Sequence, residues 1–281
     1  MSKFLSDVAR TEFDTQVKLA YQGGSKLRDT VEYRSGIVGD TYKFRLMGKG
    51  QGHQRTGSSS LVVPMDISHS LITATMTNHE HPEYTDIFDQ AEVNFDEKRK
   101  LTETIGKAMG RTEDQLVIDA VVAGTFNTTA TDGQGFDIAA GATAFTTAKL
   151  RTLRAYYDDL ECDDTVTIVV TGTGMQSLLA NTETTSSDFN SVKALVNGEL
   201  NTFMGFKFQT VGSRRLEGEL GGAGVIAYAW APNAVGLAAS SIEKSMAVDW
   251  VPERVSWLCN GMLKAGAAII DPEGTARITY V

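Results

Sequence analysis

Two segments with the alternating pattern of β-strands flank a glycine-rich stretch near the start of the chain. In DTYKFRLMG, the apolar residues Tyr42, Phe44 and Leu46 alternate with Lys43, Arg45 and Met47. The second segment, SLVVPMDISHSLITATMTNH, is rich in β-branched residues and is extended in character. Together they predict a long hairpin with its tip at residues 48–60. A two-stranded ribbon alone is at best marginally stable in water, so this hairpin must pack on further structure, which another chain can supply.

The tip itself, LMGKGQGHQRTGSSS, has the glycines, lysine and hydroxyl groups of a phosphate-binding loop. A Walker loop requires Gly-x-x-x-x-Gly-Lys-Ser/Thr between a strand and a helix, so that amides and the helix dipole converge on the phosphate. Here Lys49 follows the first glycine, and strand patterns lie on both sides. The pattern therefore favours a hairpin turn over a phosphate site.

A very long helix is predicted over residues 95–123. Apolar residues recur at helical spacing, Asn94 is a suitable N-cap with Glu97 three residues later, and Gly124 is a stop signal. Such a helix is about 40 Å long, well above the average for a globular protein. Gly106 and Gly110 weaken this helix. Either a close backbone contact offsets that cost, or the two glycines are merely tolerated.

The remainder alternates helical and strand patterns. TTAKLRTLRAYYDDL is predicted as a helix, DTVTIVV as a buried strand, GTGMQSLLAN as a turn and helix, and FMGFKFQTV and GVIAYAW as strands. The tail from Ser245 onward is mostly extended, with a turn at residues 271–274. We therefore expect an α+β protein in which a compact α/β segment interrupts a second set of elements.

The stretch VTIVVTGTGMQSLL is the nearest approach to a dinucleotide-binding motif. Gly172 and Gly174 follow a strand and open a helix, but Ser177 replaces the third glycine. The acidic residue expected about 20 residues later, at the end of a second strand, is absent. Glycines that allow a tight strand-to-helix turn are therefore the preferred interpretation, and a nucleotide-binding enzyme is kept as a rival.

No other motif predicts catalysis, a cofactor or a metal. HEHPE places His79 and His81 on one face of an extended segment, but Pro82 forbids the helix of His-Glu-x-x-His metalloproteases. Cys162 and Cys259 fit no metal or redox spacing, which suggests a reducing compartment. A surface cluster of histidines is the preferred interpretation, and no catalytic residue, cofactor or metal ligand is predicted.

The charge balance argues against a free nucleic-acid-binding protein. The net charge is −9 and the isoelectric point is near 5.0, whereas contacts to phosphates require clustered Lys and Arg. No apolar run has the length of a membrane span, and the first residues do not form a signal peptide. A soluble, intracellular protein is expected.

The order of these elements resembles the major capsid protein of tailed bacteriophages, which has the Hong Kong 97 capsid fold. The most similar stretch is VTIVVTGTGMQSLLANTETTSSDFNSVKALVNGELNTFMGFKFQTVGSRRL, together with the closing APNAVGLAAS and GAAIIDPEGTARITYV. The resemblance covers nearly the whole chain. It implies an N-terminal arm (1–38), an extended β-hairpin loop (39–80), a peripheral domain (81–145 and 241–281) with a spine helix over about 93–124, and an α/β axial domain (146–240).

The resemblance also assigns the glycine-rich tip to a contact between subunits. The loop concentrates positive charge on an otherwise acidic chain, and the segment before the long helix concentrates negative charge. The candidates for inter-subunit contacts are Lys43, Arg45, Lys49, His53 and Arg55 on the loop, and Glu83, Asp86, Asp89 and Glu92 before the helix.

As a capsid protein, the chain is expected to form pentamers and hexamers of an icosahedral shell around double-stranded DNA, which it encloses without sequence-specific binding. The implied partners are a separate scaffolding protein, a portal and decoration proteins. The implied location is the virion, after assembly in the host cytoplasm. An encapsulin-like compartment shell shares the fold and is the alternative.

Overall fold

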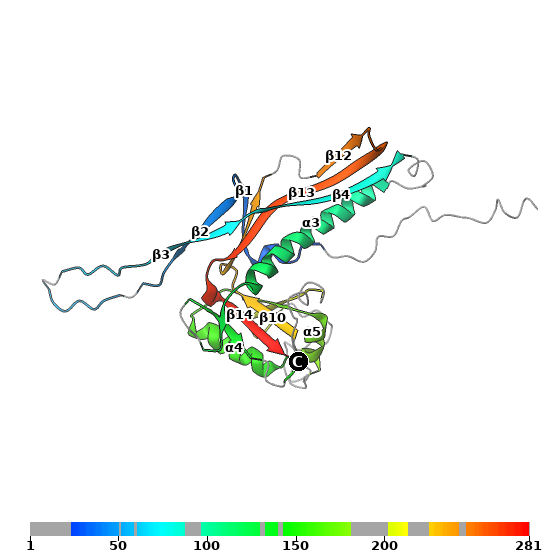
Figure 1. The fold of residues 1–281 in the computed structure, drawn as a ribbon. Coiled ribbons are helices and arrows are strands. Elements are labelled where there is room, and N and C mark those ends of the chain that lie inside the picture. Colours follow the sequence, from blue (N-terminus) through cyan, green and yellow to red (C-terminus); the bar gives the residue numbers. More distant parts are fainter. Residues whose placement is uncertain are drawn as a thin grey trace, which may run out of the picture. The chain divides into compact units, whose positions relative to one another are not determined.

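The structure, a computed structural model, describes residues 24–50, 52–58, 61–87, 97–129, 133–139, 143–180, 202–212, 225–241 and 246–280. Helices and strands are mixed along the chain, as predicted (Figure 1). Two compact units are formed. Unit 1 consists of Met1–Ser25, Asn78–Thr112 and Ser241–Lys264, and unit 2 of Lys26–Thr77, Glu113–Ser240 and Ala265–Val281. The predicted arm and domain boundaries remain predictions.

Unit 1 is built from strands and the first part of the long helix. Helix α3 spans Glu97–Val122, which confirms the predicted helix; its predicted cap, Asn94, lies outside the described residues. Strand β12 (Met246–Val251) pairs antiparallel with β13 (Ser256–Ile269), and β4 (Thr77–Asp86) also pairs with β13.

The two glycines of α3 have different surroundings. A Cβ on Gly110 would lie 2.6 Å from the backbone nitrogen of Ser25, whereas a Cβ on Gly106 would meet nothing within 4 Å. Gly110 therefore permits a close approach of the chain to the helix, and Gly106 is a tolerated glycine on an exposed position. Each of the two alternatives considered from the sequence applies to one of them.

The main core lies in unit 2, around a seven-stranded sheet with the order β5-β6-β14-β10-β7-β9-β8. The strands are β5 (Phe126–Asn127), β6 (Gly135–Ile138), β7 (Thr167–Val170), β8 (Thr202–Phe203), β9 (Phe206–Thr210), β10 (Val225–Trp230) and β14 (Thr275–Tyr280). All four residues of β7 are buried, as the continuous apolar run predicts for a central strand.

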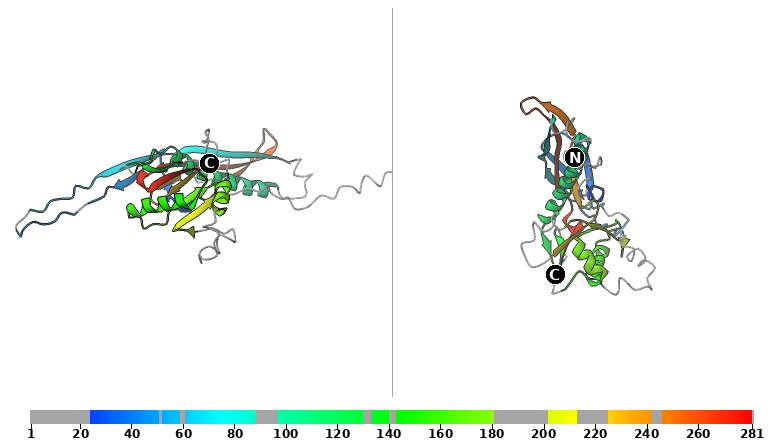
Figure 2. Two further views of the ribbon diagram at one scale, coloured as in Figure 1. Left: turned by 90° about the horizontal axis from the view of Figure 1, so that it is seen from below. Right: turned by 90° about the vertical axis from the view of Figure 1, so that its right-hand side faces the viewer.

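Helices α4 (Thr147–Asp159) and α5 (Gly172–Leu179) belong to the same unit as this sheet (Figure 2). The rings of Tyr156 and Phe136 stack with centroids 4.4 Å apart, and the fully buried Tyr157 makes an edge contact with Phe206. These aromatic contacts fix α4 on the sheet.

A second group of strands in unit 2 carries the predicted hairpin. Strand β1 (Glu32–Ile37) pairs parallel with β11 (Val235–Ser240), which pairs antiparallel with the end of β13. Short 3-10 helices are η1 (Arg28–Thr30) and η3 (Pro272–Gly274). Among the described residues, no helix is long and apolar enough to cross a membrane.

Candidate functional site

The predicted hairpin is present as β2 (Thr41–Met47) and β3 (His69–Thr75), which pair antiparallel and lie side by side in Figure 1. The register places Phe44 opposite Ile72 and Arg45 opposite Leu71. Because side chains alternate across a strand, one face of the ribbon is mostly apolar and partly buried, with Phe44 and Ala74 buried, and the other carries exposed residues.

The second strand is shorter than predicted. It begins at His69, and residues 61–68 of the predicted strand form no regular element. Pro64 lacks a donor for a strand ladder, and Asp66 has a left-handed backbone with φ of 50°. These two residues explain why the extended pattern does not continue into pairing.

The base of the hairpin is anchored by the packing of Phe44 on a glycine. Phe44 is 4% exposed and belongs to a small core with Ala74, Met76, Ala238 and Ile270. A Cβ on Gly236 of β11 would lie 2.5 Å from the Phe44 ring. The sequence gives no signal for this contact, because the two residues are far apart along the chain. A glycine can also be required for other purposes, such as a turn.

The hairpin loop (residues 48–68) exposes large apolar side chains. The amide of Gly48 donates to the carbonyl of Ser68 at 2.8 Å, which closes the ladder between the strands. Beyond this bond, Leu61 is 91%, Val62 95%, Val63 63% and Met65 50% exposed. Exposed apolar residues that cluster in this way commonly mark an interaction surface. The sequence carries a signal for this surface in LVVPM, a run that also fits a strand pattern.

The predicted loop cations lie along the ribbon and its loop. Lys43 and Arg45 are on the exposed face of β2, and His53 is exposed. Arg55 donates from Nη2 to the carbonyl of Ser58 at 2.5 Å. Lys49 forms an ion pair in its own chain, with Nζ 2.7 Å from Oε2 of Glu273.

Of the predicted acidic partners, Glu83 is exposed and Asp86 half-buried on β4. Asp89 and Glu92 lie outside the described residues. The predicted pairing joins different subunits, so the structure of one chain leaves it a prediction.

Unit 1 also presents partly exposed aromatic side chains, on β4, β12 and β13. The guanidinium of Arg254 lies 4.5 Å from the centre of the Tyr84 ring, and Tyr84 is 40% exposed. On β12 and β13, Trp250 and Trp257 make an edge contact at 5.4 Å, and Nζ of Lys98 lies 3.6 Å from the Trp257 ring. Aromatic residues of this kind are enriched in protein interfaces.

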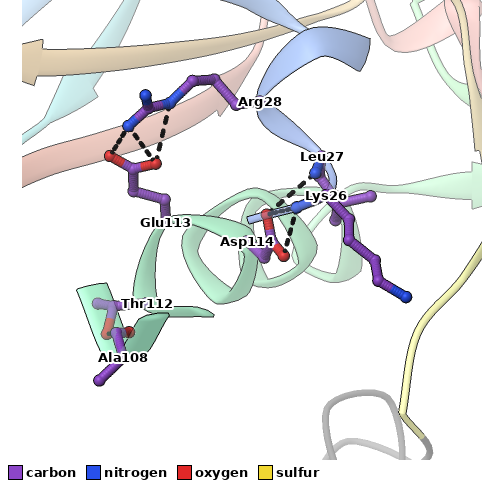
Figure 3. A network of polar contacts seen from close by, with 7 residues as sticks. All are labelled: Lys26, Leu27, Arg28, Ala108, Thr112, Glu113 and Asp114. Atoms are coloured by element: carbon purple, nitrogen blue, oxygen red, sulfur yellow. Dashed lines mark hydrogen bonds and ion pairs between the residues drawn. The ribbon is translucent and has the colours of Figure 1, made fainter. Parts of the chain in front are cut away.

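A buried carboxylate on α3 holds the segment that leads into β1 (Figure 3). The Asp114 carboxylate accepts from the backbone amides of Lys26 and Leu27, each at 3.0 Å. Glu113 forms a bidentate ion pair with Arg28, whose guanidinium donates to the carboxylate. The same figure shows the Thr112 hydroxyl donating to the carbonyl of Ala108. The periodicity of α3 gave no signal for this anchoring role of its acids.

The dinucleotide-like motif is explained by packing. A Cβ on Gly174 would lie 2.1 Å from the hydroxyl of Tyr280, and the amide of Gly174 is bonded to Oγ1 of Thr171, the N-cap of α5. The predicted passage from a strand directly into a helix is present between β7 and α5, and Gly174 is explained by its close packing against Tyr280.

The histidine motif HEHPE lies within β4. Nε2 of His81 is 2.9 Å from Oγ1 of Thr112, and His79 is half-buried on the same strand. Within the described ranges, no group of three or more His, Cys, Asp or Glu side chains is arranged to hold a metal.

Comparisons with known proteins point to one family. Residues 5–281 match the family described as phage capsid protein. No curated protein matches the chain. Among solved structures, the capsid of cyanophage P-SCSP1u is similar with a TM-score of 0.74 and 14% identity, over 100% of this chain and 95% of that chain.

Two further solved structures show the same likeness. The capsid of an empty GTA particle has a TM-score of 0.76 and 12% identity, over 100% of this chain and 98% of that one. A structure from Mycobacterium phage Che8 has a TM-score of 0.71 and 12% identity, over 95% of this chain and 96% of that one. The predicted fold class, the Hong Kong 97-type capsid fold, is confirmed.

Proposed function

This chain belongs to the phage capsid protein family and forms the shell of a virion, and we propose that it does so as pentamers and hexamers of an icosahedral shell around double-stranded DNA. The family favours this function over the encapsulin-like alternative. We also propose that the chain has no enzymatic role, that it assembles in the host cytoplasm, and that scaffolding, portal and decoration proteins are its partners. The arm, extended loop, peripheral and axial domains, with the boundaries given above, belong to this proposal.

The single observation that carries the assembly mechanism is the exposed apolar surface of the hairpin loop. Four large apolar residues of the loop are at least half exposed. Burying one such side chain fully contributes about 1.5–3 kcal/mol, whereas an exposed ion pair contributes about 0–1 kcal/mol and is weakened by salt. The loop is therefore held on a neighbouring subunit mainly by its apolar residues.

The loop cations supply orientation in this proposal. Lys43, Arg45, His53 and Arg55 face the neighbour's acidic segment, which contains Glu83, Asp86, Asp89 and Glu92, and Lys49 acts in a different way that is described below. Complementary charge favours one register and one partner more than it raises affinity. Tyr84 is on the same face of β4 as Asp86, two residues away, and offers the loop a partly exposed ring beside this acid.

The apolar contribution can be tested by replacing two loop residues. Leu61→Ser with Val62→Ser is expected to leave the subunit folded by circular dichroism and to reduce shell formation, measured by sedimentation velocity and negative-stain microscopy. Val38→Ser is the matched control, because Val38 is 95% exposed, as is Val62, but lies outside the loop. Shells that form equally well from the double variant would contradict the proposal.

The charge contribution has its own test. Arg45→Glu with Arg55→Glu is expected to weaken assembly most at low ionic strength, where surface charges are least screened. Adding Asp86→Lys is expected to restore part of the loss. Assembly that does not depend on these charges at any salt concentration would show that the cations are merely solvated.

A further inference from the structure

Lys49, at the start of the hairpin loop, forms an ion pair within its own chain. Its Nζ lies 2.7 Å from Oε2 of Glu273, a residue 224 positions later. The Lys49 side chain is 76% exposed and that of Glu273 only 19%. The carboxylate is thus a fixed, mostly buried acceptor, and the lysine reaches it from the surface.

Hydrogen bonds from several segments hold the backbone and the carboxylate of Glu273. The amide of Glu273 donates to the Asp271 carboxylate at 3.1 Å, and the Tyr156 hydroxyl donates to the Glu273 carbonyl at 2.8 Å. The other carboxylate oxygen, Oε1, accepts from the amide of Gly133 at 3.1 Å. Three segments of unit 2 therefore hold this acceptor in place.

Lys49 lies where the hairpin ladder ends. Gly48, the residue before it, makes the last bond of the ladder, to Ser68. A constraint on Lys49 therefore acts at the point where the two arms of the loop begin to separate, and it limits the directions in which the loop can leave β2.

We propose that Glu273 is a positioning residue for shell assembly: it holds Lys49 within the same chain and thereby fixes the start of the hairpin loop for docking on a neighbouring subunit. This inference rests on the proposed role of the loop. It assigns Lys49 to a contact within the subunit, whereas the other loop cations are proposed to face the neighbouring subunit.

Charge exchange between the two positions separates this proposal from a contact between subunits. Lys49→Glu and Glu273→Lys are each expected to lower the yield of shells by about fivefold or more, because attraction is replaced by repulsion. The two changes in one chain should restore the yield. A mixture of the two single variants should not, since no chain in it has an internal pair.

A control variant breaks an ion pair that lies outside the hairpin loop. Glu32→Lys breaks a comparable ion pair, with Arg34 at 2.6 Å outside the loop, and is expected to leave assembly unchanged. Restoration by the mixture would show that the contact joins two chains, and failure of the double exchange in a chain that is folded by circular dichroism would also overturn the proposal.

A second measurement does not depend on assembly. A carbodiimide converts a contacting lysine and carboxylate into an amide, with water transferred to the reagent as a urea. In dilute, unassembled protein mixed from ¹⁴N- and ¹⁵N-labelled chains, mass spectrometry should find the Lys49–Glu273 amide within single chains only. Its absence, or mixed-label products, would overturn the internal pair. Its presence in a protein that forms no shells would leave the pair intact and would count against the proposed function instead.

Discussion

The ring of Phe44 rests on the backbone of Gly236, at a distance that leaves no space for a side chain. A Cβ at position 236 would lie within 2.5–2.7 Å of three ring carbons. Phe44 is on the hairpin and Gly236 on β11, so this contact joins the exposed ribbon to the body of unit 2. The stability of the hairpin thus depends on a glycine that is not part of it.

We predict that Gly236→Ala destabilises the subunit by about 1–3 kcal/mol, as expected for an added methyl group in a packed site. The added Cβ must displace the Phe44 ring or the strand beneath it. Urea unfolding measures the loss, and hydrogen exchange in β2 should locate it. Phe44→Leu in the same background should recover part of the stability, because a smaller side chain leaves space for the methyl group. Unchanged stability in Gly236→Ala would contradict the observed packing.

The hairpin also shows which features of the fold can be predicted from the sequence. Its strand β2 was predicted from alternation, which is a local property of the chain. The anchoring of Phe44 on Gly236 could not be predicted, because it is a contact between distant residues and a glycine has no pattern of its own. The late start of β3 is an intermediate case: Pro64 is evident in the sequence, but where pairing begins also depends on the left-handed backbone at Asp66.

The two glycines of α3 should respond in opposite directions to the same change. Gly106→Ala is expected to stabilise the subunit by about 0.5–1 kcal/mol, because alanine is the better helix former and the position is open. Gly110→Ala is expected to destabilise it by about 1–3 kcal/mol, because the methyl group would meet the backbone of Ser25. Thermal unfolding of both variants is the measurement. A similar shift for both would contradict the assignment of one close contact and one open position.

The carboxylate of Asp114 should be important for the segment that leads into β1. Asp114 is 1% exposed, and the amide of the fully buried Leu27 bonds to it. Asp114→Ala leaves that amide without this acceptor, and we expect a loss of about 1–3 kcal/mol. Asp114→Asn is the matched control, because its side-chain oxygen can still accept and the loss should be smaller. Exchange of the Leu27 amide should accelerate more in the alanine variant than in the asparagine variant.

The carboxyl groups of Glu273 and Asp271, in the turn that binds Lys49, lead to a prediction about pH. The hydrogen bond from Lys49 is the main cause that holds the pKa of Glu273 below its ordinary value of 4.5, and the amide of Gly133 acts in the same direction. Burial raises the pKa of Asp271 above its ordinary value of 3.8, although its bond from the Glu273 amide opposes the shift. These two carboxyl groups therefore affect stability in opposite directions as the solution is acidified.

A lowered pKa in the folded state means that Glu273 stabilises the subunit above pH 4.5, and that this contribution is lost as the pH falls through the folded-state pKa. The raised pKa of Asp271 has the reverse sign: its contribution is present below pH 3.8 and is lost as the pH rises through its folded-state value. We predict that Glu273→Gln lowers the free energy of unfolding at neutral pH by at most about 1 kcal/mol, because Lys49 is largely exposed. The difference from the wild type should shrink below pH 4.5, and Lys49→Met should abolish most of it. Urea unfolding at a series of pH values checks this, and a difference that stays constant into acid would show that the charge of Glu273 does not matter.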